Sequence, residues 1–148
     1  MNEMESSPAA SMPDVGDQTI AALLHAAHAL EDKLETALGH VGLSGPKFSV
    51  LGELVKAETP LALSELAARL SCVRSNITQL IDRVEAEGLV RRVDCPTDRR
   101  SVKAEITEEG RARYTAGAIE VARVETEFRA SMSSADRAAL GQMLSVLG

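Results

Sequence analysis

Hydrogen-bonding side chains cluster on one segment that is predicted to be helical, from about Arg74 to Glu87. At 100° per residue, Ile77, Ile81 and Val84 fall together on the face that must turn toward the core. The rest of the segment offers guanidinium, hydroxyl and amide groups, and the candidate contacts are Arg74, Ser75, Asn76, Thr78, Gln79 and Arg83. Such groups bond to base edges and phosphates when a helix enters the major groove of DNA. A surface helix without a partner shows the same polarity, so this face alone leaves both interpretations open.

A second group of charged side chains, Asp98-Arg99-Arg100, follows shortly after that helix. Period-two alternation predicts two short strands, 89–93 and 101–106, joined by the polar loop 94–100. In that loop we expect the Asp98 carboxylate to pair with Arg100 and to orient its guanidinium, while Arg99 supplies a second cation. An arginine held at a hairpin tip suits the narrow minor groove of DNA, where the negative potential is strongest. The alternative is a solvated charge cluster at a turn.

The charge of the chain is unevenly distributed. The 148 residues carry a formal net charge of −6, which by itself argues against a nucleic-acid partner. Between Arg69 and Lys103, however, eight basic residues outnumber five acidic ones, a net charge of +3, and the remainder carries −9. A basic middle segment on an acidic body is compatible with a nucleic-acid surface and equally with local scatter of solvated charges.

Hydrophobic periodicity defines the elements that must position these side chains. It predicts six helices, at about 20–41, 44–58, 65–70, 74–87, 107–131 and 134–147. The predicted N-caps are Ser44, Ser64, Thr107 and either Ser133 or Ser134. Gly88 fits the left-handed position that ends a helix, and residues 61–63 form a short extended segment. A helix–turn–helix followed by a hairpin predicts a mainly α fold with a small β-hairpin wing, the winged helix-turn-helix.

Four segments carry a more specific pattern in the correct order and spacing. They are LAARL at 66–70, SNITQLIDRVEAEGLVRR at 75–92, DRR at 98–100 and ITEEG at 106–110. In these segments the chain resembles the MarR family of bacterial regulators. The resemblance covers roughly Ile20 to the C-terminus and is most specific from Leu63 to Gly110. One departure is Val73, which stands where the family often has an N-capping serine or aspartate.

The resemblance implies a homodimer that binds double-stranded DNA. A disordered tail, 1–16, would precede a single domain, 17–148, with its winged helix part at 44–106. The helices within 17–43 and 107–148 would interlock in the dimer, and two recognition helices would enter successive major grooves of a near-palindrome. The residues that match the family's DNA-reading helix are Ser75, Asn76, Thr78 and Gln79. Arg100 matches the wing arginine, Asp98 its orienting partner, and Arg92 an arginine with a structural or phosphate-binding role.

The resemblance also implies a sensor. Family members are mostly repressors that leave DNA when a small anionic or phenolic molecule, an oxidant or a metal binds, which is a shift between two populations. The expected pocket lies between the first helix, the second helix and the long helix after Thr107. No residue there identifies the effector.

Two further chemistries are weighed against structural roles. Cys72 precedes the recognition helix, whose dipole lowers the pKa of a nearby thiol, and Cys95 lies in the wing, so oxidation of either would disturb DNA contacts. His25 and His28 are spaced i, i+3 with Glu31 and Asp32 one turn on, a spacing that permits a metal site. Cysteines that fill apolar space and a histidine packed beside the apolar stripe are the alternatives.

Composition excludes several other classes. Aromatic residues make up 2% of the chain, too few for a base-stacking platform or an aromatic cofactor pocket, and no cofactor is expected. No apolar run is long enough for a membrane span, residues 1–16 lack the features of a signal peptide, and two cysteines make no disulfide framework, so we expect a cytoplasmic protein. No catalytic motif is present, which argues against an enzyme. The remaining alternative is a winged-helix module that binds a protein partner and no DNA.

Overall fold

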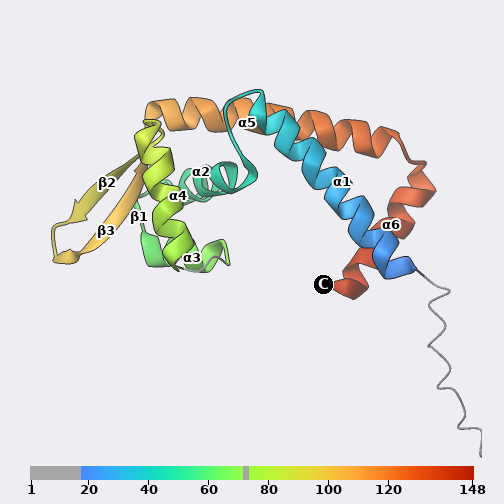
Figure 1. Ribbon diagram of the computed structural model, residues 1–148, viewed down its shortest axis with the longest axis horizontal. Helices are drawn as coiled ribbons and strands as arrows, with labels where there is room; N and C mark the ends of the chain where they lie inside the picture. Colours follow the sequence, from blue (N-terminus) through green and yellow to red (C-terminus); the bar gives the residue numbers. More distant parts are fainter. Residues whose placement is uncertain (1–17, 72–73) are drawn as a thin grey trace, which may run out of the picture.

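The computed structural model describes residues 18–71 and 74–148. Within them it contains α1 (Thr19–Gly39), α2 (Gly45–Ala57), β1 (Leu61–Ala62), α3 (Leu63–Arg69), α4 (Arg74–Ala86), β2 (Val90–Cys95), β3 (Asp98–Ile106), α5 (Glu108–Ala130) and α6 (Ser134–Leu147) (Figure 1). The predicted fold class is therefore confirmed, with a third strand, β1, added to the hairpin. The tail predicted at 1–16 lies outside the described residues.

Most helix ends follow the predicted capping chemistry. Ser44, Thr107 and Ser133 each accept a hydrogen bond from a backbone N–H in the first turn of the helix that follows. Gly88 has a φ of 76°, the left-handed conformation predicted for it. Ser64 is not an N-cap, because α3 begins at Leu63 after an Ala62 that makes no side-chain cap bond. The pairing of β1 with β3 holds the chain up to Ala62, and the helix begins immediately afterwards.

The three strands form one antiparallel sheet in the order β1-β3-β2. The predicted loop 94–100 is wrong. Asp98 already pairs with Cys95, so Asp98, Arg99 and Arg100 open β3 and only Pro96 and Thr97 turn the chain. Backbone hydrogen bonds hold this outer end of the hairpin, and its polar side chains give no alternation from which a strand is detected.

A single apolar core lies beneath the sheet and helices α2, α3 and α4. Its largest fully buried side chains are Leu51, Leu54, Leu66, Ile77, Ile81 and Leu89. Ile77, Ile81 and Val84 are 0% exposed, which confirms the inward face predicted for α4. Burial of these side chains fixes the rotation of α4 about its own axis, and with it the face that α4 shows to solvent.

Helix α5 runs from the sheet across α2 to the far end of the molecule (Figure 1). Small residues permit the close approach: a Cβ on Gly110 would lie 2.0 Å from the Leu89 carbonyl oxygen, and a Cβ on Gly117 would lie 3.0 Å from the Phe48 ring. The Phe48 and Tyr114 rings stack with centroids 4.9 Å apart. One helix therefore connects the winged helix part with the far end.

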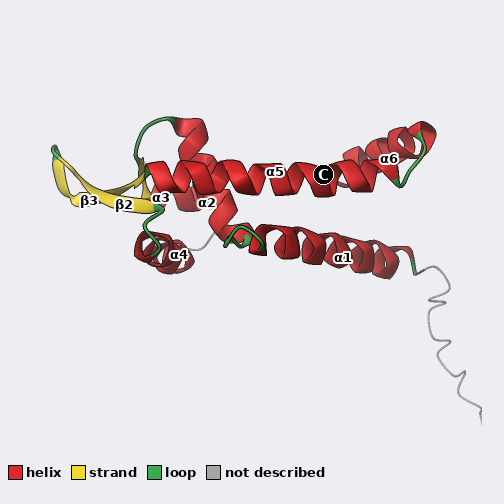
Figure 2. Cartoon of the chain, turned by 90° about the horizontal axis from the view of Figure 1, so that it is seen from above, coloured by secondary structure: helices red, strands yellow, loops and turns green. Residues whose placement is uncertain are grey.

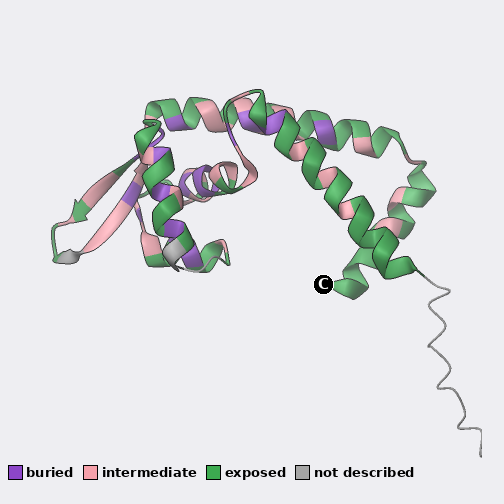
Figure 3. Ribbon diagram, in the orientation of Figure 1, coloured by how far each residue is buried: buried purple, intermediate pink, exposed green. Residues whose placement is uncertain are grey.

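The far ends of α1 and α6 extend away from the core as separate arms (Figure 2). These arms are coloured almost wholly as exposed in Figure 3, and α6 contains no buried residue. The exposed large apolar side chains of the described chain all lie on these arms or on α5: Ile20, Leu23, Leu24, Ile119, Met143, Leu144, Val146 and Leu147. None of the helices in the described part of the chain has the length and apolarity to cross a membrane.

Candidate nucleic-acid interface

The solvent face of α4 carries the side chains that the sequence analysis singled out. Asn76, Thr78, Gln79 and Arg83 are exposed; Gln79 lies opposite the buried apolar residues of the helix, and the other three lie on the flanks between. The backbone of Arg74 and Ser75 belongs to the first turn of α4, but their side chains lie outside what the structure describes. The described face thus offers two amides, a hydroxyl and a guanidinium.

Arg92 ties the hairpin to α4. Its guanidinium donates to Asp82 and, at 2.8 Å, to Glu85, and its backbone N–H donates to the second oxygen of Glu85, also at 2.8 Å. The hydrogen bond to Asp82 is the main cause that raises the pKa of Arg92 above its usual value. Because both carboxylates belong to α4, these bonds set the direction of β2 relative to α4. Of the two roles that the sequence left open for Arg92, the contacts favour the structural one.

At the outer end of the hairpin, the structure describes the backbone of Arg99 and Arg100 but not their side chains. Asp98 opens β3 opposite Cys95, at the end of the hairpin away from the core. The pairing of Asp98 with Arg100 therefore stays a prediction.

Several cations of the basic middle segment are neutralised within the protein. Arg69 pairs with Glu65 at 3.0 Å, and Arg91 pairs with Glu105 across the two strands of the hairpin. Arg92 is held as described above. Arg83 is exposed and has no ion-pair partner among the described residues. Among the described cations, Arg83 is thus the one on α4 whose charge is available to a phosphate.

Of the two cysteines considered for redox chemistry, the structure describes Cys95. Cys95 is half-buried at the end of β2, and its Sγ lies 3.2 Å from the Thr97 hydroxyl. Hydrogen bonding by Thr97 lowers the pKa of the Cys95 thiol. Cys72 lies outside the described residues.

The histidine pair weighed as a metal site lies on α1. His25 and His28 are both exposed. Within residues 18–71 and 74–148, no three His, Cys, Asp or Glu side chains gather closely enough to hold a metal ion.

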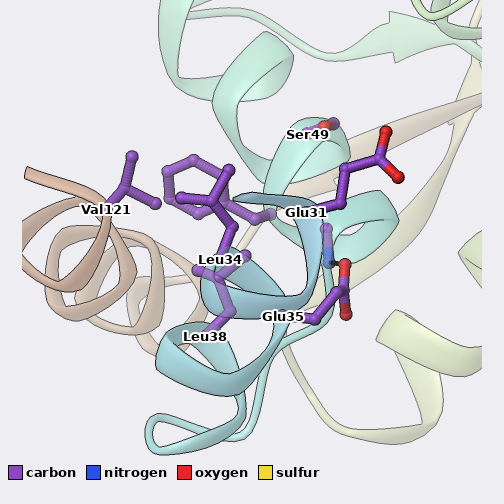
Figure 4. Close-up of a pocket in the computed structure, with 8 residues that line it drawn as sticks. Glu31, Leu34, Glu35, Leu38, Ser49 and Val121 are labelled. Atoms are coloured by element: carbon purple, nitrogen blue, oxygen red, sulfur yellow. Dashed lines mark hydrogen bonds between the residues drawn. The ribbon is translucent and has the colours of Figure 1, made fainter. Parts of the chain in front are cut away.

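A pocket of about 270 Å³ lies where α1, α2 and α5 meet (Figure 4). It is the place that the resemblance implies for an effector. Its lining residues are Glu31, Leu34, Glu35, Leu38, Gly45, Phe48, Ser49 and Val121. Sequence reasoning missed Glu31 and Glu35 as lining residues, although their i, i+4 spacing beside the apolar stripe was a signal that one face of α1 is both apolar and acidic.

Comparison with known proteins agrees with this architecture. A family model described as the MarR family matches residues 41–101. The solved structure of the transcriptional repressor CouR, bound to a 23-mer DNA duplex, superposes with a TM-score of 0.79 at 28% identity, over 94% of this chain and 98% of that one. Residues 41–101 of the chain thus match the MarR family, and the fold as a whole is that of the MarR regulators.

Further relatives are similar to all or part of the chain. A MarR family regulator from Streptomyces coelicolor, solved in complex with DNA, has a TM-score of 0.75 at 27% identity and covers 90% of this chain and 89% of its own. The HTH-type transcriptional regulator PrsX from Escherichia coli is 37% identical over 82 residues, which are 55% of this chain and 49% of that protein. The chain spans about half the length of the curated relatives it matches.

Proposed function

We propose that this chain is a transcriptional regulator of the MarR type that binds DNA as a homodimer, with α4 in the major groove and the β2–β3 hairpin along the minor groove. The observation that supports this most is the exposed polar face of α4, held by Arg92 at a fixed direction to the hairpin. CouR and the Streptomyces coelicolor relative were both solved with DNA. A protein-binding module would give no role to the amides and the available cation on this face.

The exposed apolar side chains on the arms of α1 and α6 support the proposed dimer. Val146 is 86% exposed and Ile20 is 76% exposed, and apolar side chains at such exposure are normally covered by a partner when they form a group. A second copy that packs its own arms against these side chains would bury them and would place the two α4 helices on one side of the assembly.

We further propose that the regulator represses and that a ligand in the α1–α2–α5 pocket releases it. CouR is a transcriptional repressor, which supports the first point. The pocket supports the second, since a ligand that binds one geometry of the dimer better than the other shifts the population toward that geometry.

A binding titration tests the proposal. The protein is titrated against the DNA upstream of its own gene and against an unrelated duplex, at several salt concentrations. We expect tighter binding to the upstream fragment than to the unrelated duplex. The logarithm of the affinity should fall with the logarithm of the salt concentration with a slope of several units, because each neutralised phosphate releases counterions. Arg100→Ala is expected to weaken specific binding by about 1–3 kcal/mol and to leave the dimer intact.

Absence of binding to either duplex at low salt would contradict the proposed function and would favour a protein-binding module. An unchanged affinity of Arg100→Ala would remove the hairpin end from the mechanism while leaving α4 in it.

A further inference from the structure

The pocket between α1, α2 and α5 has charge of one sign only. Leu34, Leu38, Phe48 and Val121 give it an apolar interior, and its charged lining consists of Glu31 and Glu35. In Figure 4 both glutamates extend from α1 on the side away from Val121. No lysine, arginine or histidine lines the pocket in the part of the chain that the structure describes.

No cation among the described residues neutralises either glutamate. Glu31 has no ion-pair or hydrogen-bond partner among the described residues, and Glu35 accepts only the Gly45 backbone N–H, at 2.7 Å through Oε1. The nearest lysine on α2, Lys47, is already paired with Glu87. Two carboxylates one helical turn apart at the rim of an apolar cavity attract cations and repel anions.

We propose that this pocket binds a small organic monocation with an apolar body, whose charged end lies at Glu31 and Glu35 and whose body contacts Phe48 and Leu34. Carboxylate oxygens accept hydrogen bonds and donate none, which suits an ammonium group and excludes a carboxylate ligand. The cavity of about 270 Å³ is near the lower end of ordinary ligand pockets, so one ring with a short chain is the appropriate size. The ligand class stands on the pocket alone, whereas its regulatory effect rests on the proposed function.

Two contacts connect this site with the recognition helix. Glu35 holds the start of α2 through Gly45, and Lys47 in the first turn of α2 pairs with Glu87, directly after α4. A bound cation that pairs with the Glu35 carboxylate competes with the hydrogen bond that Glu35 accepts from Gly45. Loss of that hydrogen bond loosens the attachment of α2 to α1. The ligand and DNA would then each lower the affinity for the other by the same factor.

The test uses three probes with the same apolar body: 4-phenylbutylamine, 4-phenylbutanol and 4-phenylbutyrate. Their affinities for the full chain are measured by isothermal titration calorimetry without DNA. The amine is expected to bind at least about tenfold more tightly than the carboxylate, with the alcohol between them. Glu31→Gln and Glu35→Gln are each expected to weaken binding of the amine by roughly threefold to tenfold, with little effect on the alcohol. Asp32→Asn is the matched control, since it removes the same charge from α1 outside the pocket lining.

Equal or tighter binding of 4-phenylbutyrate, an equal effect of Asp32→Asn, or no saturable binding of the amine would overturn the proposal. The same samples are tested for DNA binding, so the two ideas fail separately. A chain that binds DNA and not the amine contradicts only the ligand class, and a chain that binds the amine and not DNA contradicts only the proposed function.

Discussion

At the scale of single residues, Arg92 holds the hairpin against α4 through two carboxylates. The amide face of α4 followed from periodicity alone, because a helix with a buried apolar stripe must turn its polar residues outward. The partners of Arg92 did not follow, because Asp82 and Glu85 lie seven or more residues away and are brought to it only by the packing of β2 on α4.

The Arg92–Glu85 pair is expected to show a coupling free energy of about 0.5–1 kcal/mol in a double-mutant cycle, since the pair is partly exposed and screened by solvent. The cycle compares Arg92→Ala, Glu85→Ala and the double variant by urea unfolding. We expect both single variants to lose DNA affinity as well, because the hairpin loses its fixed direction. Strictly additive unfolding free energies would show that the pair does not hold the hairpin.

At the scale of elements, the hairpin and α5 meet at a close backbone contact. The Thr107 hydroxyl accepts the Gly110 N–H and donates to the Gly88 carbonyl at 2.7 Å. Gly110 lies against the Leu89 carbonyl with no room for a side chain. The sequence predicted the cap at Thr107 but not this contact, because it joins residues far apart along the chain.

Gly110→Ala is therefore expected to lower the free energy of unfolding by about 1–3 kcal/mol, because the added methyl group overlaps backbone that cannot move freely. Chemical denaturation measures the change. Gly39→Ala is the control, since a Cβ there meets nothing within 4 Å. If Gly110→Ala were as stable as Gly39→Ala, α5 would not pack on Leu89 as described.

The strand boundaries at the hairpin end show where pattern reasoning fails. The loop predicted at 94–100 contains proline, threonine and charged residues, all typical of turns. Only two of its residues turn the chain, because a ribbon exposed on both sides is held by its backbone ladder and needs no apolar alternation.

At the scale of the whole molecule, the arms expose large apolar side chains that no other part of the described chain covers. Periodicity predicted the helices of the arms but not the angle at which α6 leaves α5, since that angle depends on packing at the turn between them. The structure shows Leu144 and Leu147 at 48% and 69% exposure on α6.

The double variant Leu144→Asp, Leu147→Asp is expected to be a folded monomer, because burying two carboxylates in an apolar interface costs more than the contacts return. Sedimentation velocity gives the mass, and far-ultraviolet circular dichroism reports the fold. Ser145→Asp, at another exposed position on the same helix, should remain dimeric. A double variant that stays dimeric would place the interface elsewhere.

The proposed function depends on contact between α4 and DNA, and Arg83 is the residue of α4 at which this contact is best measured. Arg83→Ala is compared with Arg129→Ala, which removes the same charge from the last turn of α5, at the other end of the molecule (Figure 1). Both are titrated with the upstream duplex over a range of salt concentrations. We expect Arg83→Ala to weaken binding and to lower the slope of log affinity against log salt concentration by about one per subunit, whereas Arg129→Ala should match the unaltered protein. Identical titrations for the two variants would contradict the contact between α4 and DNA.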